Sequence, residues 1–454
     1  MLWQKDCLSK HLDPRAGSGN AMHEANHSSN SANPYAATCD YLYALRNQGS
    51  KYGLERMEAF LACLKNPHEG FPLIHVAGTN GKGSVCAILE ALYRDNGYKT
   101  GLFTSPHLLH LGERIQVNRQ PLEEAALMEY TARMRPLAET LAKENPELGP
   151  TFFEYMAAMA FARFSEAQVD LALIETGLGG RLDATNLVDP ELSIITSIGL
   201  DHCDLLGDTF SAIAREKGGI IKPGKPVLFG FLPPEAEAVI RAIAKERQSP
   251  VHSLAERFPD PEALPETNLH GRFQRHNAAL ALYATEILQK RFPISQHTAL
   301  HQVNWPGRWQ KIALPDRNLI LDATHNPEGA AYLAENLQQL KEKPIIITGT
   351  LGEERGRSLI EAVAPHAREL ILVAPNQPRA TSTQNLRRCL PDPYPIPVRD
   401  DTIAQLFPSK NCCTAGQPGA TILVTGSIYL IGEIMSHIQG LSASDQTPNL
   451  QDRL

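Results

Sequence analysis

Short apolar runs alternate with helical segments along most of the chain, and this alternation constrains the fold more than any other feature. The runs FPLIHVAG, VDLALIETG, ELSIITSIG and KPVLFG are separated by helical segments such as VCAILEALYRDNG, FFEYMAAMAFARFSE and FSAIAREKGGI. In the first helical segment, Val85, Ile88 and Leu92 share one face, and Gly97 is placed to end the helix. Such alternation is typical of a parallel sheet covered on both faces, so the sequence predicts an α/β fold.

A second series of strands follows the helical segment RHNAALALYATEILQKRF. It comprises four apolar runs, NLILDATHN, KPIIITGT, ELILVAPN and ATILVTGS, with helices between them, one beginning at Pro327. This pattern predicts a smaller, doubly wound, Rossmann-like α/β domain. The chain has 454 residues, more than a single hydrophobic core usually organises. We predict a disordered or extended tail over 1–34, a larger domain over 35–297 and a smaller one over 298–454.

Composition excludes several classes of protein. The formal net charge is −7, which argues against a general nucleic-acid binder. No apolar run approaches the roughly 18 residues of a membrane span, and the first residues lack the apolar stretch of a secretory signal. The 8 cysteines form no C-x-x-C pair, which favours reduced thiols over a zinc ribbon or a disulfide framework. We therefore expect a cytoplasmic protein that binds neither membrane nor nucleic acid.

A glycine-rich loop, GTNGKGS at residues 78–84, lies between a predicted strand and a predicted helix. Glycines let backbone N–H groups approach phosphate oxygens, and the N-terminus of the following helix adds positive potential. Lys82 would reach the β- and γ-phosphates, and Ser84 would contact magnesium. The G-x-x-G-K-G-S spacing differs from that of the common P-loop. The alternative is a glycine-rich turn with a solvated lysine.

Polar residues follow other predicted strands. Glu175 ends LALIE, Asp201 and His202 follow SIITSIGL, and Ser105 lies in FTSPHL. Ligands of open parallel sheets bind beyond the carboxyl ends of the strands, and magnesium prefers oxygen donors. Glu175 and Ser105 match that preference. His202 would be a less usual ligand of a second ion, and its alternative is an ordinary hydrogen-bonded polar residue.

The segment GLGGRLDATN, from Gly177 to Asn186, has three glycines followed by Arg181 and Asp183. One interpretation is a glycine-rich connector in which Asp183 only pairs with Arg181. The other is a backbone turn that approaches substrate, with Asp183 available to hydrogen-bond a polar ring.

Several motifs together resemble one family. They are, in chain order, HVAGTNGKGS, TSPHL, ETGLGGRLDATN, TSIGLDH, REKGGI, the PGR of residues 306–308, and DATHNP. This order resembles the folylpolyglutamate synthase family, most closely its bifunctional dihydrofolate synthase/folylpolyglutamate synthase members in the Mur ligase superfamily. The resemblance runs from about residue 40 to about residue 435. It implies a P-loop-type Mur ligase ATPase domain over 35–297 and a glutamate-ligase domain over 298–454.

The resemblance also implies roles at the nucleotide. Residues implied to bind ATP are Asn80, Gly81, Lys82, Gly83, Ser84, Asn277 at adenine, and Arg308 and Asp322 at phosphate and ribose. Ser105 and Glu175 would hold one magnesium ion, and Glu175 and His202 would share a second. Lys217 matches a lysine that is carbamoylated in the family, and would act in catalysis with Lys82 and His202. Without the resemblance, Lys217 would be interpreted as an exposed helix lysine.

Other segments are implied to bind the remaining substrates. The dihydropteroate segments are Gly53 and Leu54, Thr151, Phe152, Phe153 and Glu154, and Leu182, Asp183 and Ala184. His325 and Asn326 would lie near the incoming glutamate, although Asn326-Pro327 is also an ordinary helix start, with Asn as the cap. GEERGR at residues 352–357 departs from the family's D-K-D, whereas PRA at residues 378–380 is retained.

The activity implied is ATP-dependent ligation of L-glutamate to dihydropteroate and to tetrahydrofolate through an acyl phosphate, in folate biosynthesis and one-carbon metabolism. The expected ligands are ATP, two Mg²⁺ ions, L-glutamate, dihydropteroate and reduced folates, bound by a monomer. Three alternatives stay open: folylpolyglutamate synthase activity alone, a cell-wall Mur ligase, and a non-catalytic nucleotide-binding regulator.

Overall fold

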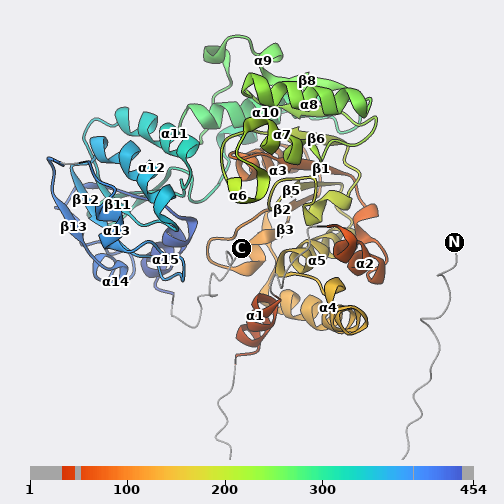
Figure 1. Ribbon diagram of the computed structural model, residues 1–454, viewed down its shortest axis with the longest axis horizontal. Helices are drawn as coiled ribbons and strands as arrows, with labels where there is room; N and C mark the ends of the chain where they lie inside the picture. Colours follow the sequence, from red (N-terminus) through yellow and green to blue (C-terminus); the bar gives the residue numbers. More distant parts are fainter. Residues whose placement is uncertain (1–32, 46–52, 392, 442–454) are drawn as a thin grey trace, which may run out of the picture. The chain divides into compact units, whose positions relative to one another are not determined.

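Two β-sheets organise the computed structural model, which describes residues 33–45, 53–391 and 393–441 (Figure 1). The eight-stranded sheet A has the order β4-β3-β2-β5-β1-β6-β7-β8, and the six-stranded sheet B has the order β13-β12-β11-β14-β10-β9. The strands of sheet A are β1 (Leu73–Ala77), β2 (Thr100–Phe103), β3 (Ile115–Val117), β4 (Gln120–Pro121), β5 (Leu171–Glu175), β6 (Leu192–Ile195), β7 (Val227–Phe229) and β8 (Val251–Ser253). Those of sheet B are β9 (Gln310–Ala313), β10 (Asn318–Asp322), β11 (Ile345–Thr348), β12 (Glu369–Leu372), β13 (Val398–Asp400) and β14 (Thr421–Thr425).

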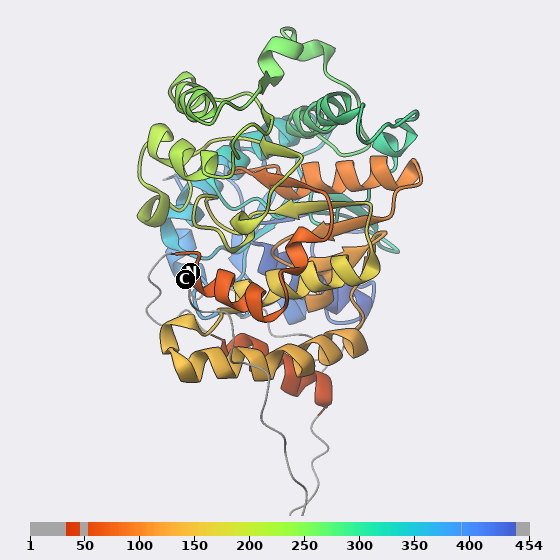
Figure 2. The ribbon, with the colours of Figure 1, turned by 90° about the vertical axis from the view of Figure 1, so that its right-hand side faces the viewer.

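Helices cover both faces of sheet A, as the alternating pattern predicts. The α-helices preceding sheet B are α1 (Pro34–Ala44), α2 (Glu55–Cys63), α3 (Lys82–Asp95), α4 (Glu124–Glu144), α5 (Phe152–Ala167), α6 (Cys203–Leu206), α7 (Phe210–Gly218), α8 (Pro234–Glu246), α9 (Leu254–Arg257) and α10 (Arg272–Leu288). On one face, Phe103 and Ile174 pack with α1, α2, α4 and α5. On the other, Ile74 and Leu173 pack with α3 and α10. Figure 2 shows α3 and α5 on opposite sides of the strands.

Sheet B is covered in the same way. Its α-helices are α11 (Pro327–Gln338), α12 (Glu353–Val363), α13 (Thr383–Arg387), α14 (Ile403–Leu406) and α15 (Ile428–Gln439). Leu321 and Val424 pack against α14 and α15, whereas Ile320 and Leu423 pack against α11 and α12. Short 3-10 helices connect elements of both parts: η1 (Pro67–Glu69), η2 (Leu111–Arg114), η3 (Pro146–Leu148), η4 (Ala184–Leu187), η5 (Pro261–Ala263), η6 (Thr298–His301) and η7 (Ala364–His366).

The edges of both sheets differ from the sequence prediction. In sheet A, β3 pairs antiparallel with β2 and β4, although β1, β2, β5, β6, β7 and β8 pair in parallel. Sheet B has six strands rather than the four predicted, because β9 and β13 were not recognised. Residues of β9 alternate between half-buried and exposed, and two of the three residues of β13 are exposed. Edge strands bury little surface, so they lack the apolar run that marks the central ones.

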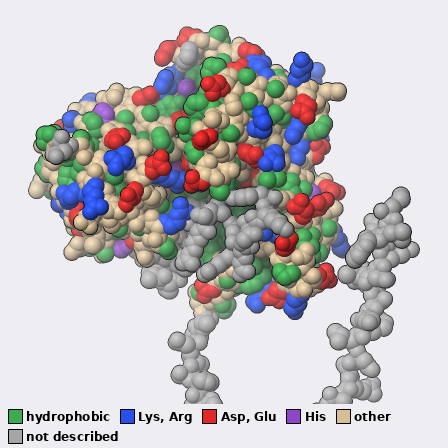
Figure 3. All heavy atoms as spheres, viewed as in Figure 1, with side chains coloured by type: hydrophobic (Ala, Val, Ile, Leu, Met, Phe, Trp, Pro, Cys, Tyr) green, Lys and Arg blue, Asp and Glu red, His purple; other side chains and the backbone are tan. Residues whose placement is uncertain are grey.

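The alternating α/β class predicted from the sequence is confirmed. The predicted domain boundary at residue 298 falls at the start of η6, between α10 and β9, and stays a prediction. From Pro34 onward the chain forms one compact unit. The predicted tail lies almost wholly outside the described residues. Among the described helices, none is both long and apolar enough to cross a membrane. Acidic and basic side chains are interspersed over the face seen in Figure 3.

Candidate active site

A cavity of about 890 Å³ is lined by residues that directly follow strands of both sheets. They include the loop after β1, Glu175 at the end of β5, His325 beyond β10, and Ser427 beyond β14. The carboxyl ends of parallel strands are the usual ligand-binding edge of such sheets. The cavity therefore joins the two binding edges that the sequence predicts separately.

Most of the predicted site residues line this cavity. They are Gly53, Asn80, Gly81, Lys82, Gly83, Ser84, Ser105, Thr151, Phe152, Phe153, Glu154, Glu175, Leu182, Asp183, Ala184, His202, Lys217, Arg308 and His325. Asp322 lines a smaller neighbouring cavity of about 70 Å³, together with Arg308 and His325. Leu54 and Asn277 line neither cavity.

The glycine-rich loop lies against the end of β6. Thr79 N–H donates to Ser197 O at 2.9 Å, and Thr196 Oγ1 donates to Asn80 O at 2.6 Å. A Cβ atom at Gly78 would lie 1.9 Å from Thr196 Oγ1, so only glycine permits this approach. The loop leads directly into α3, which begins at Lys82. Its backbone is thus pre-shaped at a helix N-terminus, where phosphate binds.

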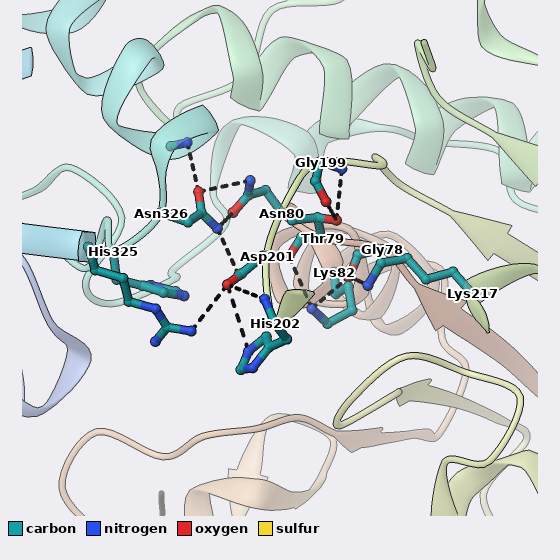
Figure 4. Close-up of polar contacts among 12 residues, drawn as sticks. Gly78, Thr79, Asn80, Lys82, Gly199, Asp201, His202, Lys217, His325 and Asn326 are labelled. Carbon is teal, nitrogen blue, oxygen red and sulfur yellow. Dashed lines mark hydrogen bonds and ion pairs between the residues drawn. The ribbon is translucent and has the colours of Figure 1, made fainter. Parts of the chain in front are cut away.

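Two lysines converge on one carbonyl of this loop. Lys82 Nζ donates to Gly78 O at 3.0 Å, and Lys217 Nζ donates to the same oxygen at 2.9 Å (Figure 4). Lys217 is only 5% exposed, which rules out the interpretation of an exposed helix lysine. Burial, with the nearby Lys82 acting in the same direction, lowers the pKa of Lys217 to about 7. A large fraction of Lys217 is therefore an uncharged amine at neutral pH.

Glu175 is the buried carboxylate of the cavity. Its Oε2 accepts a hydrogen bond from Ser105 N–H at 3.1 Å. Burial raises its pKa, while Lys82 and Arg308 act in the opposite direction. Across the described residues, no group of three or more His, Cys, Asp or Glu side chains forms a metal-binding cluster. The donors here are instead one carboxylate and nearby hydroxyls, a set that suits magnesium completed by phosphate and water.

Asp201 connects the two sheet-bearing parts of the chain. Its carboxylate accepts hydrogen bonds from Arg355 Nη2 and from Asn326 Nδ2, both at 3.1 Å (Figure 4). Burial alone would raise the pKa of Asp201, but His325, His202 and Arg355 together lower it below its ordinary value. Asp201 is therefore a weak base held between residues from opposite sides of the cavity.

Asn326 caps α11, as the sequence suggests, and its side chain also contacts residues across the cavity. Its Oδ1 accepts from Gly329 N–H at 2.9 Å, which caps α11. Its Nδ2 donates to Asn80 Oδ1 at 2.9 Å as well as to Asp201. Asn80 Nδ2 in turn donates to Glu328 Oε2 at 2.7 Å. The helix cap thus also contacts the side chain of the glycine-rich loop.

His325 and Arg308 belong to the wall of the cavity that sheet B supplies. His325 Nδ1 lies 3.0 Å from Ala323 O. Burial lowers the pKa of His325, Arg308 and Arg355 act in the same direction, and Asp201 opposes them. Within the described residues, no hydrogen bond or ion pair engages the Arg308 guanidinium. This wall therefore presents an unpaired cation next to a neutral imidazole.

The GLGGRLDATN segment is braced from within by Asp183. The Asp183 carboxylate accepts from Leu178 N–H at 2.8 Å, Thr185 N–H at 3.0 Å and Thr185 Oγ1 at 2.5 Å. Arg181 instead pairs with Glu216 at 2.9 Å. The interpretation in which Asp183 pairs only with Arg181 is therefore wrong.

Two residues expected at ATP are held by the protein itself. Asn277 Nδ2 donates to Gln274 Oε1 at 3.0 Å, and its Oδ1 faces Gly81, where a Cβ atom would lie 2.4 Å away. Asp322 accepts from Trp309 N–H at 3.0 Å and from Thr324 Oγ1 at 2.6 Å. Asn277 thus supports the back of the loop, and Asp322 positions the segment that carries Arg308.

Sequence reasoning missed several residues of the cavity wall. Arg355 lies in the GEERGR segment, and Ser427 is the N-cap residue of α15, after β14. The Gly-Ser pair that follows an apolar strand is a signal that would have identified Ser427. Tyr43 stacks on Phe152 with ring centroids 5.3 Å apart, and Arg114 lies over the same ring at 5.4 Å. Tyr43 comes from α1, far from the motifs, and Arg114 ends η2, just after TSPHL, without a pattern of its own that marks it.

Comparisons with known proteins agree with this geometry. The Mur ligase middle domain model matches residues 76–260, and the Mur ligase glutamate ligase domain model matches residues 307–428. The dihydrofolate synthase/folylpolyglutamate synthase of Bacillus subtilis is 35% identical over 86% of this chain and 96% of its own length. The folylpolyglutamate synthase of Lacticaseibacillus casei is 31% identical over 89% of this chain and 99% of its own.

A solved structure gives the same result. The structure of Escherichia coli FolC in complex with DHPP and ADP superposes with a TM-score of 0.76 at 28% identity, covering 90% of this chain and 99% of that one. The resemblance and the two-domain Mur ligase fold predicted from the sequence are confirmed. This chain belongs to the dihydrofolate synthase/folylpolyglutamate synthase family of Mur ligases and is an ATP-dependent ligase.

Proposed function

We propose that this enzyme ligates L-glutamate both to dihydropteroate and to tetrahydrofolate, activating each carboxylate with ATP. The observation that carries the proposal is the single cavity that contains the glycine-rich loop, Glu175, Lys217, Arg308 and His325. A ligase of this kind must hold a triphosphate, a carboxylic acid and an amine in reach of one another. The cavity brings a phosphate-binding edge and a cationic wall together in that way.

The triphosphate would lie on the backbone of residues 78–84, with Lys82 and Arg308 as its cations. Arg308 supports this role because it lines the cavity and no other described residue pairs with it. Asp322 and Asn277 would act at the nucleoside end, Asn277 through its contact with Gly81. Fixed cations and N–H groups aimed at the transferring phosphoryl group stabilise the charge that develops there.

Magnesium would be held by Ser105, Glu175 and His202, and we propose two ions. Glu175 fits this role because it is a buried carboxylate near Ser84 and Ser105, among the oxygen donors that magnesium prefers. When bound, magnesium would neutralise charge on the phosphate oxygens. His202 is the N-cap residue of α6, beside Asp201, and its side chain is 39% exposed and lines the cavity.

Lys217 is proposed to be carbamoylated. Its lowered pKa supports this, because carbon dioxide reacts with a neutral amine and not with an ammonium group. A carbamate also removes the repulsion between two cations that share Gly78 O. The carbamate oxygens would then face the same cavity as Glu175 and His202.

The pteridine and benzoyl rings would bind between Gly53, Thr151 to Glu154, and Leu182 to Ala184. Glu154 accepts from Thr151 N–H at 2.7 Å and from Arg56 Nε at 3.2 Å, so it holds the start of α5 in place. Phe152 and Phe153 offer aromatic surface that suits planar rings. The acid group would extend from there toward the glycine-rich loop, and the incoming glutamate would bind near His325.

In the proposed reaction, a carboxylate oxygen attacks the γ-phosphorus of ATP, which gives an acyl phosphate and ADP. The α-amine of glutamate then attacks the acyl carbon, the bond to the phosphate oxygen breaks, and an amide and phosphate are released. The protein positions the reactants and excludes water from an intermediate that would otherwise hydrolyse. We expect the enzyme to act as a monomer.

ADP release, measured with and without L-glutamate and each acid substrate, tests the proposal. Glutamate-dependent release with both dihydropteroate and tetrahydrofolate is expected. Release with tetrahydrofolate alone would leave a dedicated folylpolyglutamate synthase. Release only with a UDP-sugar peptide would indicate a cell-wall ligase, and no release with any acid would indicate a regulator.

A variant sharpens the assignment of the ring-binding wall. Asp183→Ala is expected to reduce the dihydropteroate reaction more than glutamate addition to tetrahydrofolate, if the two rings bind differently. Because Asp183 also braces its own loop through Leu178 and Thr185, thermal stability is measured alongside. Equal losses in both reactions, accompanied by a lower melting temperature, would assign Asp183 a purely structural role.

A further inference from the structure

The proposed ligase reaction contains a proton transfer that needs a base. The α-amine of an amino acid is protonated at neutral pH, and an ammonium group has no lone pair with which to attack an acyl phosphate. A base must therefore take one proton before the carbon–nitrogen bond forms. On the proposed function, that base is a side chain of the cavity.

Most acidic side chains of the cavity are already engaged. Glu154 accepts from Arg56, Glu216 pairs with Arg181, and Asp183 accepts three hydrogen bonds from its own loop. Glu175 belongs to the proposed magnesium site. Asp201 accepts from Arg355 and Asn326, and its lowered pKa makes it a poor proton acceptor. The carboxylates therefore provide charge and structure and not a free base.

His325 differs from these groups in its hydrogen bonding. Its Nδ1 lies 3.0 Å from Ala323 O, and a carbonyl oxygen can only accept. Nδ1 therefore carries the proton, and the lone pair of the neutral ring is on Nε2. The ring is half-buried and lines the cavity, beside the ligand-binding edge of sheet B. Figure 4 shows His325 at the end of its strand, in the same region as Asp201 and Asn326.

The charges around His325 suit an amino-acid substrate. Burial lowers the pKa of His325 and keeps its ring neutral, Arg308 and Arg355 act in the same direction, and the carboxylate of Asp201 opposes them. The Arg355 guanidinium would attract a carboxylate of glutamate, whereas Asp201 and the imidazole lone pair would attract its ammonium group. His202 also lines this region, but from the sheet A side and at the proposed metal site.

We propose that His325 is the general base that accepts a proton from the α-ammonium group of the incoming amino acid. The N–H bond of the ammonium breaks and its proton moves to Nε2, which makes the ring an imidazolium ion. The amine lone pair forms the carbon–nitrogen bond, and the carbon–oxygen bond to phosphate breaks with its electron pair. The second amine proton leaves with the departing phosphate or the solvent, which balances the step.

Hydroxylamine separates this role from glutamate binding. It is an uncharged amine at neutral pH and traps acyl phosphates as hydroxamates without needing a base. In His325→Gln, kcat with saturating glutamate is expected to fall at least about 100-fold, the usual scale of general-base loss. Hydroxamate formation from the same acid and ATP is expected to stay within about threefold of the wild-type rate. A change of that size corresponds to the loss of no more than one ordinary hydrogen bond. Hydroxamate formation also shows that the variant is folded.

Two further measurements complete the test. The wild-type kcat is expected to fall as the pH drops through the pKa of His325, which is lower than that of an ordinary histidine. The His325→Gln variant should not show this fall in kcat at low pH. Added imidazole should partly restore glutamate ligation in His325→Ala. His301→Gln, at an exposed histidine of η6, is the matched control.

Three results would overturn the proposal. The first is an equal loss of the glutamate and hydroxylamine reactions, and the second is a rise in KM for glutamate with kcat unchanged. The third is a variant that keeps the wild-type fall in kcat at low pH. A wild-type enzyme that makes hydroxamate but never responds to glutamate would instead contradict the proposed function itself.

Discussion

The two walls of the cavity are built differently, although both follow the ends of parallel strands. On the sheet A wall, Lys82, Glu175, Asp183 and Lys217 are all hydrogen-bonded to neighbouring backbone. On the sheet B wall, Arg308 has no partner among the described residues. Groups that the protein already satisfies need little reorganisation when phosphate binds. On the proposed function, the sheet A wall is thus preorganised for ATP, whereas the sheet B wall offers the Arg308 charge for ligands to pair with.

The largest expected effect is at the centre of the preorganised wall. Lys82→Ala should abolish ligation and leave the fold intact, because Lys82 contacts only two backbone carbonyls of its own loop. Turnover and thermal melting are measured together, with Lys245→Ala on the exposed face of α8 as the control. Turnover above a tenth of wild type would show that the loop does not need its lysine to bind phosphate. The contrast drawn between the two walls of the cavity would then be wrong for Lys82.

The second prediction tests how strongly the sheet A wall constrains Lys217. Its pKa of about 7 in the folded protein lies below the value of 10.5 expected for an unfolded chain. The unfolded state therefore binds more protons between these values, so stability rises with pH across this window. The cost of burying the charge is fully present below pH 7 and is relieved toward pH 10.5.

Lys217→Met removes that cost. In carbon dioxide-depleted buffer without ligands, its gain in unfolding free energy over wild type should be larger at pH 6 than at pH 9 by at least about 1 kcal/mol. Chemical denaturation at both pH values measures the difference, and Lys245→Met should show none. An equal gain at both pH values would mean that Lys217 is charged in the folded protein.

The third prediction concerns Asn326, where the two walls meet. Asn326→Ala removes the cap of α11 and should cost about 1 kcal/mol of stability, whereas Asn326→Ser keeps a capping oxygen and should cost less than half of that. Both variants lose the Nδ2 donor to Asn80 and Asp201. Both should therefore raise KM for ATP by about fivefold, the equivalent of one hydrogen bond. If only the alanine variant changes KM, the cap and not the contact between the walls supports the loop.

The smallest effect is expected at Arg181. Its side chain is 51% exposed and pairs with Glu216 outside the Asp183 network. Arg181→Ala should therefore change stability by less than about 1 kcal/mol, as exposed ion pairs do, and leave KM for dihydropteroate unchanged. Asp183→Asn is the variant for comparison. It should lower stability by more than Arg181→Ala does, because it disrupts a buried carboxylate that accepts several hydrogen bonds. Equal effects of the two variants would restore the interpretation in which Arg181 holds the loop.

The sequence by itself determined the local parts of this protein. The period of apolar residues gave the central strands and most helices, because burial of one face imposes that period. The glycines of residues 78–84 gave the loop, because only glycine permits the approach seen at Gly78 and Gly81. Asn326-Pro327 gave the start of α11, since cap and first helical residue are neighbours in the chain.

Tertiary structure decided what depends on residues distant in the chain. Lys217 contacts Gly78 across 139 positions, and Arg355 contacts Asp201 across 154. Lys217 was expected, without the family resemblance, to be an exposed helix lysine, and Arg355 lies where the family pattern fails. Burial and charge neighbours set the pKa of Lys217 and the neutrality of His325, and neither leaves a local periodic signal. The chemistry of the cavity thus depends on contacts between residues distant in the chain. The strands, the glycine-rich loop and the start of α11, by contrast, depend on patterns among neighbouring residues.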